Sequence, residues 1–230
     1  MKESFYIDIS LSYLCICLGV LLFLKLIVSV LTNNFYTLHV FVRKFSLLDL
    51  ESPATPLELA TYINGIYALP QELGKKSLRS LKSTLYLDFL VMPFLYGTIF
   101  LLCMQLSMKF QIVGRIFFQM LGWLQILAWI FDIIGNVYLL KKIHPKTIPS
   151  AKNLHSMMQK NTLSKYIIYL GTVVICISIM IYFWLTGNYS YISLHYFIII
   201  ILEIIAFLIL KKVTAKDPKN ILDKYSGVVN

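Results

Sequence analysis

The chain has 230 residues, of which 58% are hydrophobic and 14% are charged, and its mean hydropathy is +0.75. Soluble domains carry about 25% charged residues, so this composition excludes a water-soluble globular fold, and it excludes intrinsic disorder because Leu, Ile, Phe and Tyr are abundant. The formal charge of +10 is interpreted as a sign of membrane topology and of a surface for anionic lipid, rather than of nucleic-acid binding.

Five apolar runs are long enough to cross the hydrocarbon core, which takes about 20 helical residues. They cover residues 11–31, 85–106, 117–140, 166–186 and 191–210. Lipid offers the backbone no hydrogen-bond partner, and the runs lack the alternation of a membrane barrel, so each is expected to be a helix. The predicted fold class is therefore all-α, with residues 1–230 forming one integral membrane domain of five transmembrane helices.

The distribution of Lys and Arg predicts the orientation of these spans. Seventeen of the 21 cationic residues fall in the segments 32–84, 141–165 and 211–230, whereas the N-terminal segment and the two short loops hold three. Cationic segments stay on the cytoplasmic side of the membrane. We therefore expect a multi-pass protein of the cell (inner) membrane, with its N-terminus outside, its C-terminus in the cytoplasm, and the first span retained rather than cleaved as a signal.

The segment between the first two spans, residues 34–84, is expected to form short helices on or near the cytoplasmic membrane surface. Apolar residues recur there at helical spacing, at positions Leu31, Phe35, Leu38, Val42 and Phe45. Arg43 and Lys44 stand beside this stripe. The pattern predicts that the first span continues into an interfacial helix, which Pro53 ends.

Thr55, Pro56 and Glu58 predict the start of a second helix in this segment. Thr55 suits the N-cap and Pro56 the first helical position, while Glu58 is expected to reach back to the backbone N–H of the cap. Glu58 is therefore interpreted as a capping residue rather than as a catalytic acid. This helix is expected to stop near Pro70, and the basic stretch at residues 75–82 to lead directly into the second span.

Four charged side chains fall inside the apolar runs, where each costs about 2.5 kcal/mol or more. They are Lys25, Asp88, Asp132 and Glu203. Counted from the cytoplasmic ends of the spans, all four lie about 9 to 14 Å deep, so they are expected to form one layer. Tyr96 shares a helix face with Asp88, and Asn136 shares one with Asp132. These six residues are the candidate binding cluster.

No cofactor and no metal site are predicted from the remaining reactive residues. The cysteines all fall within the apolar runs, where a thiol is expected to pack rather than to react. The histidines lie in loops or at span ends without the spacing of metal ligands, at His39, His144, His155 and His195. We therefore name no catalytic residue, and whether the chain is an enzyme stays open, because the sequence gives no positive sign of one.

Three short segments within residues 56–140 carry a resemblance to a known family. They read Leu57-Glu58-Leu59-Ala60, Leu87-Asp88-Phe89 with Pro93 and Tyr96, and Asp132-Ile133-Ile134-Gly135-Asn136. This pattern resembles a family of small, uncharacterised bacterial polytopic inner-membrane proteins, in which a Leu-Asp-Phe helix is followed by Tyr and another helix carries Asp-x-x-Glu-Asn. The chain departs from the family at Gly135, where the pattern has Glu. The resemblance implies an inner-membrane protein and no particular activity.

Three classes of function remain open at this point. The first is a helix-bundle scaffold or accessory subunit, in which the buried polar layer holds the helices together. The second is a small proton or cation transporter or channel that uses the intramembrane carboxylates and would need to form oligomers to enclose a pore. The third is a membrane-embedded lipid-modifying enzyme. The expected partners are the bilayer, anionic headgroups at the basic loops, and a second copy or another membrane protein; no nucleic acid is expected.

Overall fold

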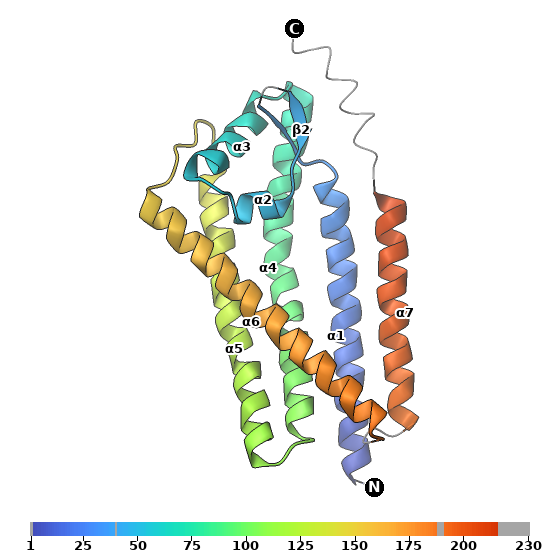
Figure 1. The fold of residues 1–230 in the computed structure, drawn as a ribbon. Helices are drawn as coiled ribbons and strands as arrows, with labels where there is room; N and C mark the ends of the chain where they lie inside the picture. Colours follow the sequence, from blue (N-terminus) through green and yellow to red (C-terminus); the bar gives the residue numbers. More distant parts are fainter. Residues whose placement is uncertain (1, 40, 188–190, 216–230) are drawn as a thin grey trace. The chain divides into compact units, whose positions relative to one another are not determined.

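A computed structural model of the chain describes residues 2–39, 41–187 and 191–215 (Figure 1). These residues form seven helices and one two-stranded antiparallel sheet. The elements are α1 (Lys2–Thr32), β1 (Tyr36–Leu38), β2 (Val42–Lys44), α2 (Leu47–Glu51), α3 (Pro56–Ala68), α4 (Gln71–Ser107), α5 (Ile112–Lys142), α6 (Lys152–Leu185) and α7 (Tyr191–Thr214). The predicted helical class is confirmed, apart from the short β-hairpin.

Four helices among the described residues are long and apolar enough to cross a membrane. They are the Leu11–Thr32 part of α1 and the whole of α4, α5 and α6. Each contains one of the first four apolar runs, and α4 carries the basic stretch directly into the second run, as expected. Helix α7 forms over the fifth run but is not among these four, so a fifth crossing stays a prediction.

The chain folds into two compact units, and the long helices contribute residues to both. Unit 1 comprises Met1–Lys25, Leu90–Phe131 and Ser164–Leu210, and unit 2 comprises Leu26–Phe89, Asp132–Leu163 and Lys211–Asn230. The single membrane domain expected from the sequence stays a prediction.

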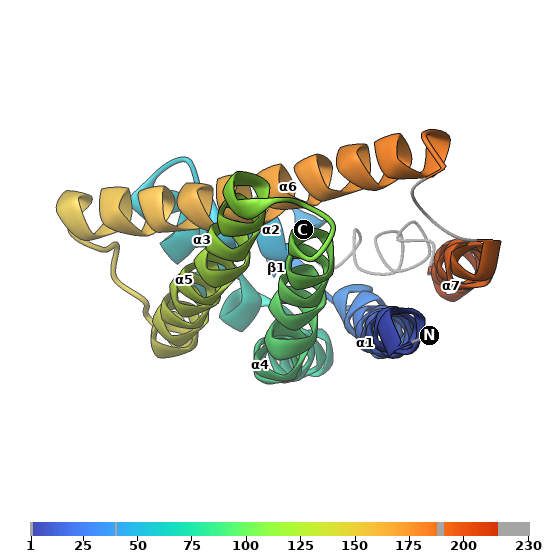
Figure 2. The same cartoon turned by 90° about the horizontal axis from the view of Figure 1, so that it is seen from below.

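In unit 1, α6 lies obliquely across one face of α4 and α5 (Figures 1 and 2). Aromatic rings fill one end of this packing: the ring of Phe110 lies 5.1 Å from that of Phe118 and 5.0 Å from that of Phe183. Helices α1 and α7 also meet in this unit, where Ser12 Oγ donates to the Tyr196 hydroxyl at 3.0 Å. Many remaining apolar side chains of unit 1 are exposed, as expected for helices that face lipid.

Unit 2 contains a compact body that we call the cap, residues 33–69, built from the hairpin, α2 and α3. Its apolar side chains pack against the first half of α4 and the end of α5 in one cluster. The buried members are Phe35, Phe45, Leu50, Leu59, Tyr62, Ile63, Ile66, Leu81, Leu85, Leu139 and Ile143. These side chains are at most 6% exposed, so the cap has a core of the kind found in soluble proteins.

The interfacial helix expected from Leu31 to Phe45 is wrong, because α1 ends at Thr32 and a β-hairpin follows. Tyr36 pairs with Lys44, and Thr37 pairs with Arg43. Spacings of three and four residues fit a helix face, but the register of the hairpin also brings Phe35 opposite Phe45, and their ring centroids are 5.2 Å apart. The aromatic and β-branched residues of this stretch favour strands once α3 offers a surface to cover.

Helix α3 begins as predicted, but one capping contact differs. Thr55 is the N-cap and accepts from the Glu58 N–H, and Pro56 occupies the first turn. The Glu58 carboxylate, however, accepts from the N–H of Ala54 at 2.7 Å rather than from that of Thr55. The helix ends at Ala68, close to the predicted stop. Glu58 is thus a capping residue, as expected, acting one residue earlier.

Gly65 brings α3 into direct contact with the hairpin. A Cβ at this position would meet the Thr37 Oγ1 and the carbonyl oxygen of Leu38 well inside van der Waals contact. Thr37 Oγ1 also donates to the carbonyl oxygen of Tyr62 at 2.9 Å, which holds the strand at this distance. Only glycine leaves room for so close an approach of two backbones.

Candidate functional site

Asp88 and Asn136 meet between α4 and α5 in unit 2. Asn136 Nδ2 donates to Asp88 Oδ2 at 2.9 Å, and the two side chains are 1% and 6% exposed. A carboxylate away from water loses its hydration, and the amide N–H replaces part of it. Two of the six candidate residues therefore form one interhelical contact.

The six candidate residues are divided between the two units. Asp132 belongs to unit 2 with Asp88 and Asn136, where it is buried on α5 one helical turn before Asn136. Lys25, Tyr96 and Glu203 belong to unit 1. The single charged layer expected from the sequence therefore stays a prediction, whereas the contact between Asp88 and Asn136 is a feature of unit 2.

Within unit 1, the carboxylate of Glu203 lies against a glycine of α1. Glu203 Oε1 is 3.0 Å from the position that a Cβ of Gly19 would take. Glu203 Oε2 is buried and has no hydrogen-bond partner among the described residues. Tyr96 of the same unit is buried and packs edge-on against Tyr169, with 6.5 Å between the ring centroids.

A second polar pair in unit 1 joins α5 and α6. Gln125 Nε2 donates to Thr172 Oγ1 at 2.9 Å and to the Leu121 carbonyl at 3.2 Å. Thr172 Oγ1 in turn donates to the Ile168 carbonyl at 2.7 Å, so its hydroxyl is used both as donor and as acceptor. Gln125 and Thr172 are 1% and 2% exposed, and their contact fixes the register between two otherwise apolar helices.

Cys103 and Cys176 form a third contact in unit 1, between α4 and α6. Their Sγ atoms are 3.6 Å apart, and neither side chain is exposed. The sequence predicts that both thiols pack in the core, and the structure confirms this, but their proximity could not be seen from positions 73 residues apart.

We expect oxidation to join these two thiols. A membrane-permeant azo oxidant such as diamide should take one hydrogen from each thiol and leave an intramolecular disulfide, because the two sulfur atoms already lie in contact at 3.6 Å. Mass spectrometry of the digested protein should then find a peptide linking residues 103 and 176. Cys103→Ser should abolish this peptide. A linked pair of Cys15 and Cys17 in its place would contradict the described packing of α4 and α6.

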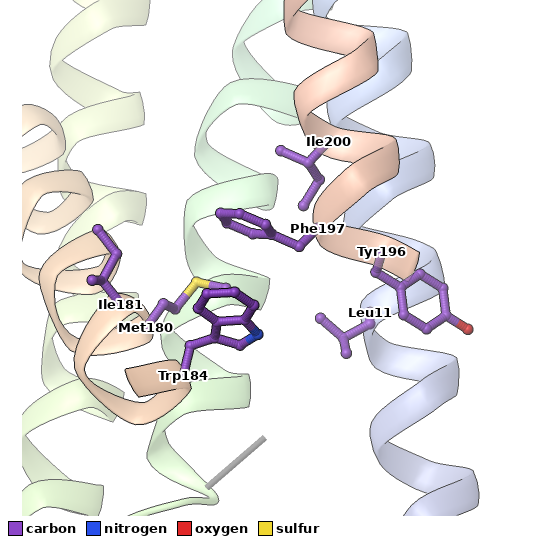
Figure 3. A pocket seen from close by; sticks show the side chains of 7 residues that line it. All are labelled: Leu11, Met180, Ile181, Trp184, Tyr196, Phe197 and Ile200. Carbon is purple, nitrogen blue, oxygen red and sulfur yellow. The ribbon is translucent and has the colours of Figure 1, made fainter. Parts of the chain in front are cut away.

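An apolar cavity of about 50 Å³ lies between α1, α6 and α7 in unit 1 (Figure 3). Its walls are Leu11, Met180, Ile181, Trp184, Tyr196, Phe197 and Ile200. The rings of Trp184 and Phe197 stack at 6.0 Å beside it. A cavity of this size holds only a few atoms and offers a ligand almost no polar partner, so we interpret it as a packing gap.

The polar contacts of the cap were not found from the sequence. The Arg43 guanidinium donates to the hydroxyl of Tyr62, and that hydroxyl donates to Glu58 Oε1 at 3.2 Å. The spacing of four residues between Glu58 and Tyr62 on α3 was a usable signal for the second contact. The first contact depends on the hairpin, which the helical interpretation of residues 31–45 had concealed.

Among the described residues, no three His, Cys, Asp or Glu side chains gather in a group that could hold a metal ion. Comparison of the chain with models of protein families, with curated proteins and with solved structures gives no match.

Proposed function

We propose that this chain is an integral membrane protein that works as a helix-bundle scaffold or accessory subunit and carries a compact cap at the cytoplasmic surface. It crosses the inner membrane five times, with α7 as the fifth span. This role requires a partner, either a second copy of the chain or another membrane protein. The partner would bind the exposed apolar faces of unit 1.

Charge supports this topology. The segments 32–84, 141–165 and 211–230 hold seventeen of the 21 Lys and Arg residues. Five crossings place all three segments on one side of the membrane and the N-terminus on the other. An even number of crossings would separate these basic segments by a bilayer.

The observation that carries the scaffold role is the hydrogen bond from Asn136 to Asp88. It joins two long apolar helices through polar side chains that are almost fully buried. Interhelical hydrogen bonds in membranes contribute about 0.6 kcal/mol on average and up to about 1.7 kcal/mol, which is enough to select one register of packing. Gln125 and Thr172 do the same between α5 and α6.

Residues outside the spans hold the cap in the same way. Asn64 Nδ2 donates to the Thr147 carbonyl at 3.0 Å, and the Thr147 N–H donates to Asn64 Oδ1 at 2.8 Å. Gln159 Nε2 donates to the Pro53 carbonyl at 2.8 Å. These contacts connect the cap to the loop after α5 and to the start of α6, so the cap is suited to present a rigid surface to a partner.

Asn136→Leu tests this role, because it keeps the number and branching of the side-chain heavy atoms and removes the donor to Asp88. We expect the free energy of unfolding in detergent to fall by about 1 to 2 kcal/mol, since the carboxylate stays buried with one donor fewer. Asp88→Asn is the matched control: it keeps an acceptor for Asn136 and should change the free energy of unfolding by about 0.5 kcal/mol or less. Thermal unfolding followed by circular dichroism measures both.

A second candidate, proton or cation transport, is favoured by one observation, the buried and unpartnered Oε2 of Glu203. An ionisable side chain inside a membrane is often part of an ion pathway. The scaffold role predicts that the wild type in liposomes gives no proton or cation flux above that of empty liposomes. A flux that Glu203→Gln abolishes without loss of thermal stability would contradict the scaffold role, as would an unchanged stability of Asn136→Leu.

A further inference from the structure

The cap contains a polar pocket that the scaffold role does not use. Its cavity volume is about 290 Å³. The hairpin supplies Arg43 and His39 to its wall, and the start of α3 supplies Glu58, Tyr62 and threonine hydroxyls. This is room for about ten water molecules at their volume in the liquid, or for a ligand with about ten non-hydrogen atoms.

The guanidinium of Arg43 is exposed at this wall. It donates to the Tyr62 hydroxyl and lies over the Tyr62 ring, 5.0 Å from the centroid, and it forms no ion pair with any carboxylate in the described part of the chain. A guanidinium has five N–H donors, so several remain for a ligand. His39, on the same wall, is exposed and able to donate from its ring.

Both carboxylate oxygens of Glu58 already accept hydrogen bonds from neutral donors. Its Oε2 accepts from the Ala54 N–H and its Oε1 from the Tyr62 hydroxyl. Burial raises the pKa of the Tyr62 phenol above its ordinary value, so the phenol stays protonated and donates to Glu58. The Tyr62 hydroxyl thus stands between the Glu58 carboxylate and the Arg43 guanidinium, whose remaining N–H groups are left for an anion.

Threonine hydroxyls provide a second kind of contact in the pocket. Thr61 Oγ1 donates to the Leu57 carbonyl at 2.9 Å and Thr37 Oγ1 donates to the Tyr62 carbonyl at 2.9 Å, so both oxygens retain lone pairs. Thr55 Oγ1 accepts from the Glu58 N–H, so its own proton is available. The pocket therefore combines a bidentate anion donor with acceptors for ligand hydroxyls.

We propose that this pocket binds a phosphate ester that also carries free hydroxyl groups, of the size of a glycerol phosphate. The phosphoryl group pairs with Arg43 and His39, and the hydroxyls donate to the threonine oxygens. Two sources offer this chemistry: a soluble polyol phosphate, or the headgroup of phosphatidylglycerol in the bilayer. Such a ligand would contact both the hairpin and α3 and would therefore stabilise their packing. Ligand binding would be an activity of the cap in addition to the scaffold role.

The test uses the full-length protein in nanodiscs of phosphatidylcholine, titrated calorimetrically with glycerol 3-phosphate, inorganic phosphate and glycerol. We expect saturable binding of glycerol 3-phosphate, about 25-fold weaker binding of inorganic phosphate, and none of glycerol, since each of the two lost hydroxyl contacts costs about a factor of five. Arg43→Gln should weaken the binding of glycerol 3-phosphate at least about tenfold. Lys44→Gln removes the neighbouring exposed cation of the same strand and should change this affinity about twofold or less.

Thr61→Val tests whether the pocket recognises the ligand hydroxyls as well as the ligand charge. It should weaken the binding of glycerol 3-phosphate about fivefold and leave the binding of inorganic phosphate unchanged, because only an acceptor for a hydroxyl is lost. If Arg43→Gln fails to fold, Arg43→Lys, which keeps the charge but loses the bidentate fork, takes its place with an expected loss of several-fold. Absence of saturable binding to the wild type, or equal losses with the variants at positions 43 and 44, would overturn the proposal.

A parallel titration in nanodiscs that contain phosphatidylglycerol assigns the source. Weaker apparent binding of glycerol 3-phosphate there, together with phosphatidylglycerol retained by the wild type and not by Arg43→Gln in native mass spectrometry, identifies the lipid headgroup as the occupant. Equal binding in the two kinds of nanodisc identifies a soluble ligand. Both results support the site, and neither depends on the flux measurements that test the scaffold role.

Discussion

Gly65→Ala is expected to open the cap and to lower its free energy of local unfolding by about 3 kcal/mol. The added Cβ would overlap the Leu38 carbonyl and Thr37 Oγ1. The strand cannot easily move away, because Thr37 pairs with Arg43 in the sheet and donates to the Tyr62 carbonyl of α3. Hydrogen–deuterium exchange of the peptides that cover residues 33–69 measures this change directly.

Gly135→Ala is the matched control in the same unit. Gly135 lies inside α5, and a Cβ at this position would have no atom within 4 Å. Alanine favours the helix by up to about 1 kcal/mol over glycine, so this variant should exchange as slowly as the wild type or more slowly. Similar acceleration of exchange by both variants would show that the hairpin does not pack on α3 as described.

Phe35→Ala is expected to cost the cap about 3 to 5 kcal/mol. Phe35 has no exposed surface and stacks on Phe45, which packs in turn on Tyr62 with 5.8 Å between the ring centroids. Removing the ring leaves a cavity among neighbours that belong to the hairpin, α3 and α4. Exchange rates in the cap, and the thermal midpoint of the whole protein, report the loss.

Phe41→Ala provides the comparison, because the same side chain in the same hairpin is 67% exposed. It should change the free energy of unfolding by about 0.5 kcal/mol or less. An interfacial helix over residues 31–45 makes a different prediction: Phe35 would then lie among lipid headgroups, and its removal would leave exchange within α3 unchanged. A small effect of Phe35→Ala would therefore favour the interfacial helix over the hairpin, and would contradict the pocket at Arg43, which the hairpin forms.

The ligand pocket and the scaffold role depend in part on different residues of the cap. The scaffold needs the hairpin and α3 to stay together, and Gly65, Phe35 and Phe45 belong to that contact. The pocket lies beside this contact and shares Thr37 and Tyr62 with it, whereas its Arg43 is exposed. Phosphate binding should therefore respond to Arg43 and Thr61 without a matching loss of stability, whereas Gly65→Ala should damage both properties.

By itself, the sequence determined the helical class, the positions of the apolar runs and the start of α3. Each of these depends on interactions that act within one or two turns of chain: lipid forces any long apolar run into a helix, and Thr55 with Pro56 caps a helix locally whatever surrounds it. The burial of Cys103 and Cys176 was predictable for the same reason, since both lie inside such runs.

Only the tertiary structure decided which of these elements touch. Residues 31–45 carry an apolar pattern that fits a helix and a hairpin alike, and the surface of α3 at Gly65 selects the hairpin. The pairing of Asp88 with Asn136, the placement of Glu203 against Gly19, and the pocket at Arg43 likewise depend on which helix faces meet. Such contacts join residues far apart in the chain, and their free energy exists only when the partner element is in place.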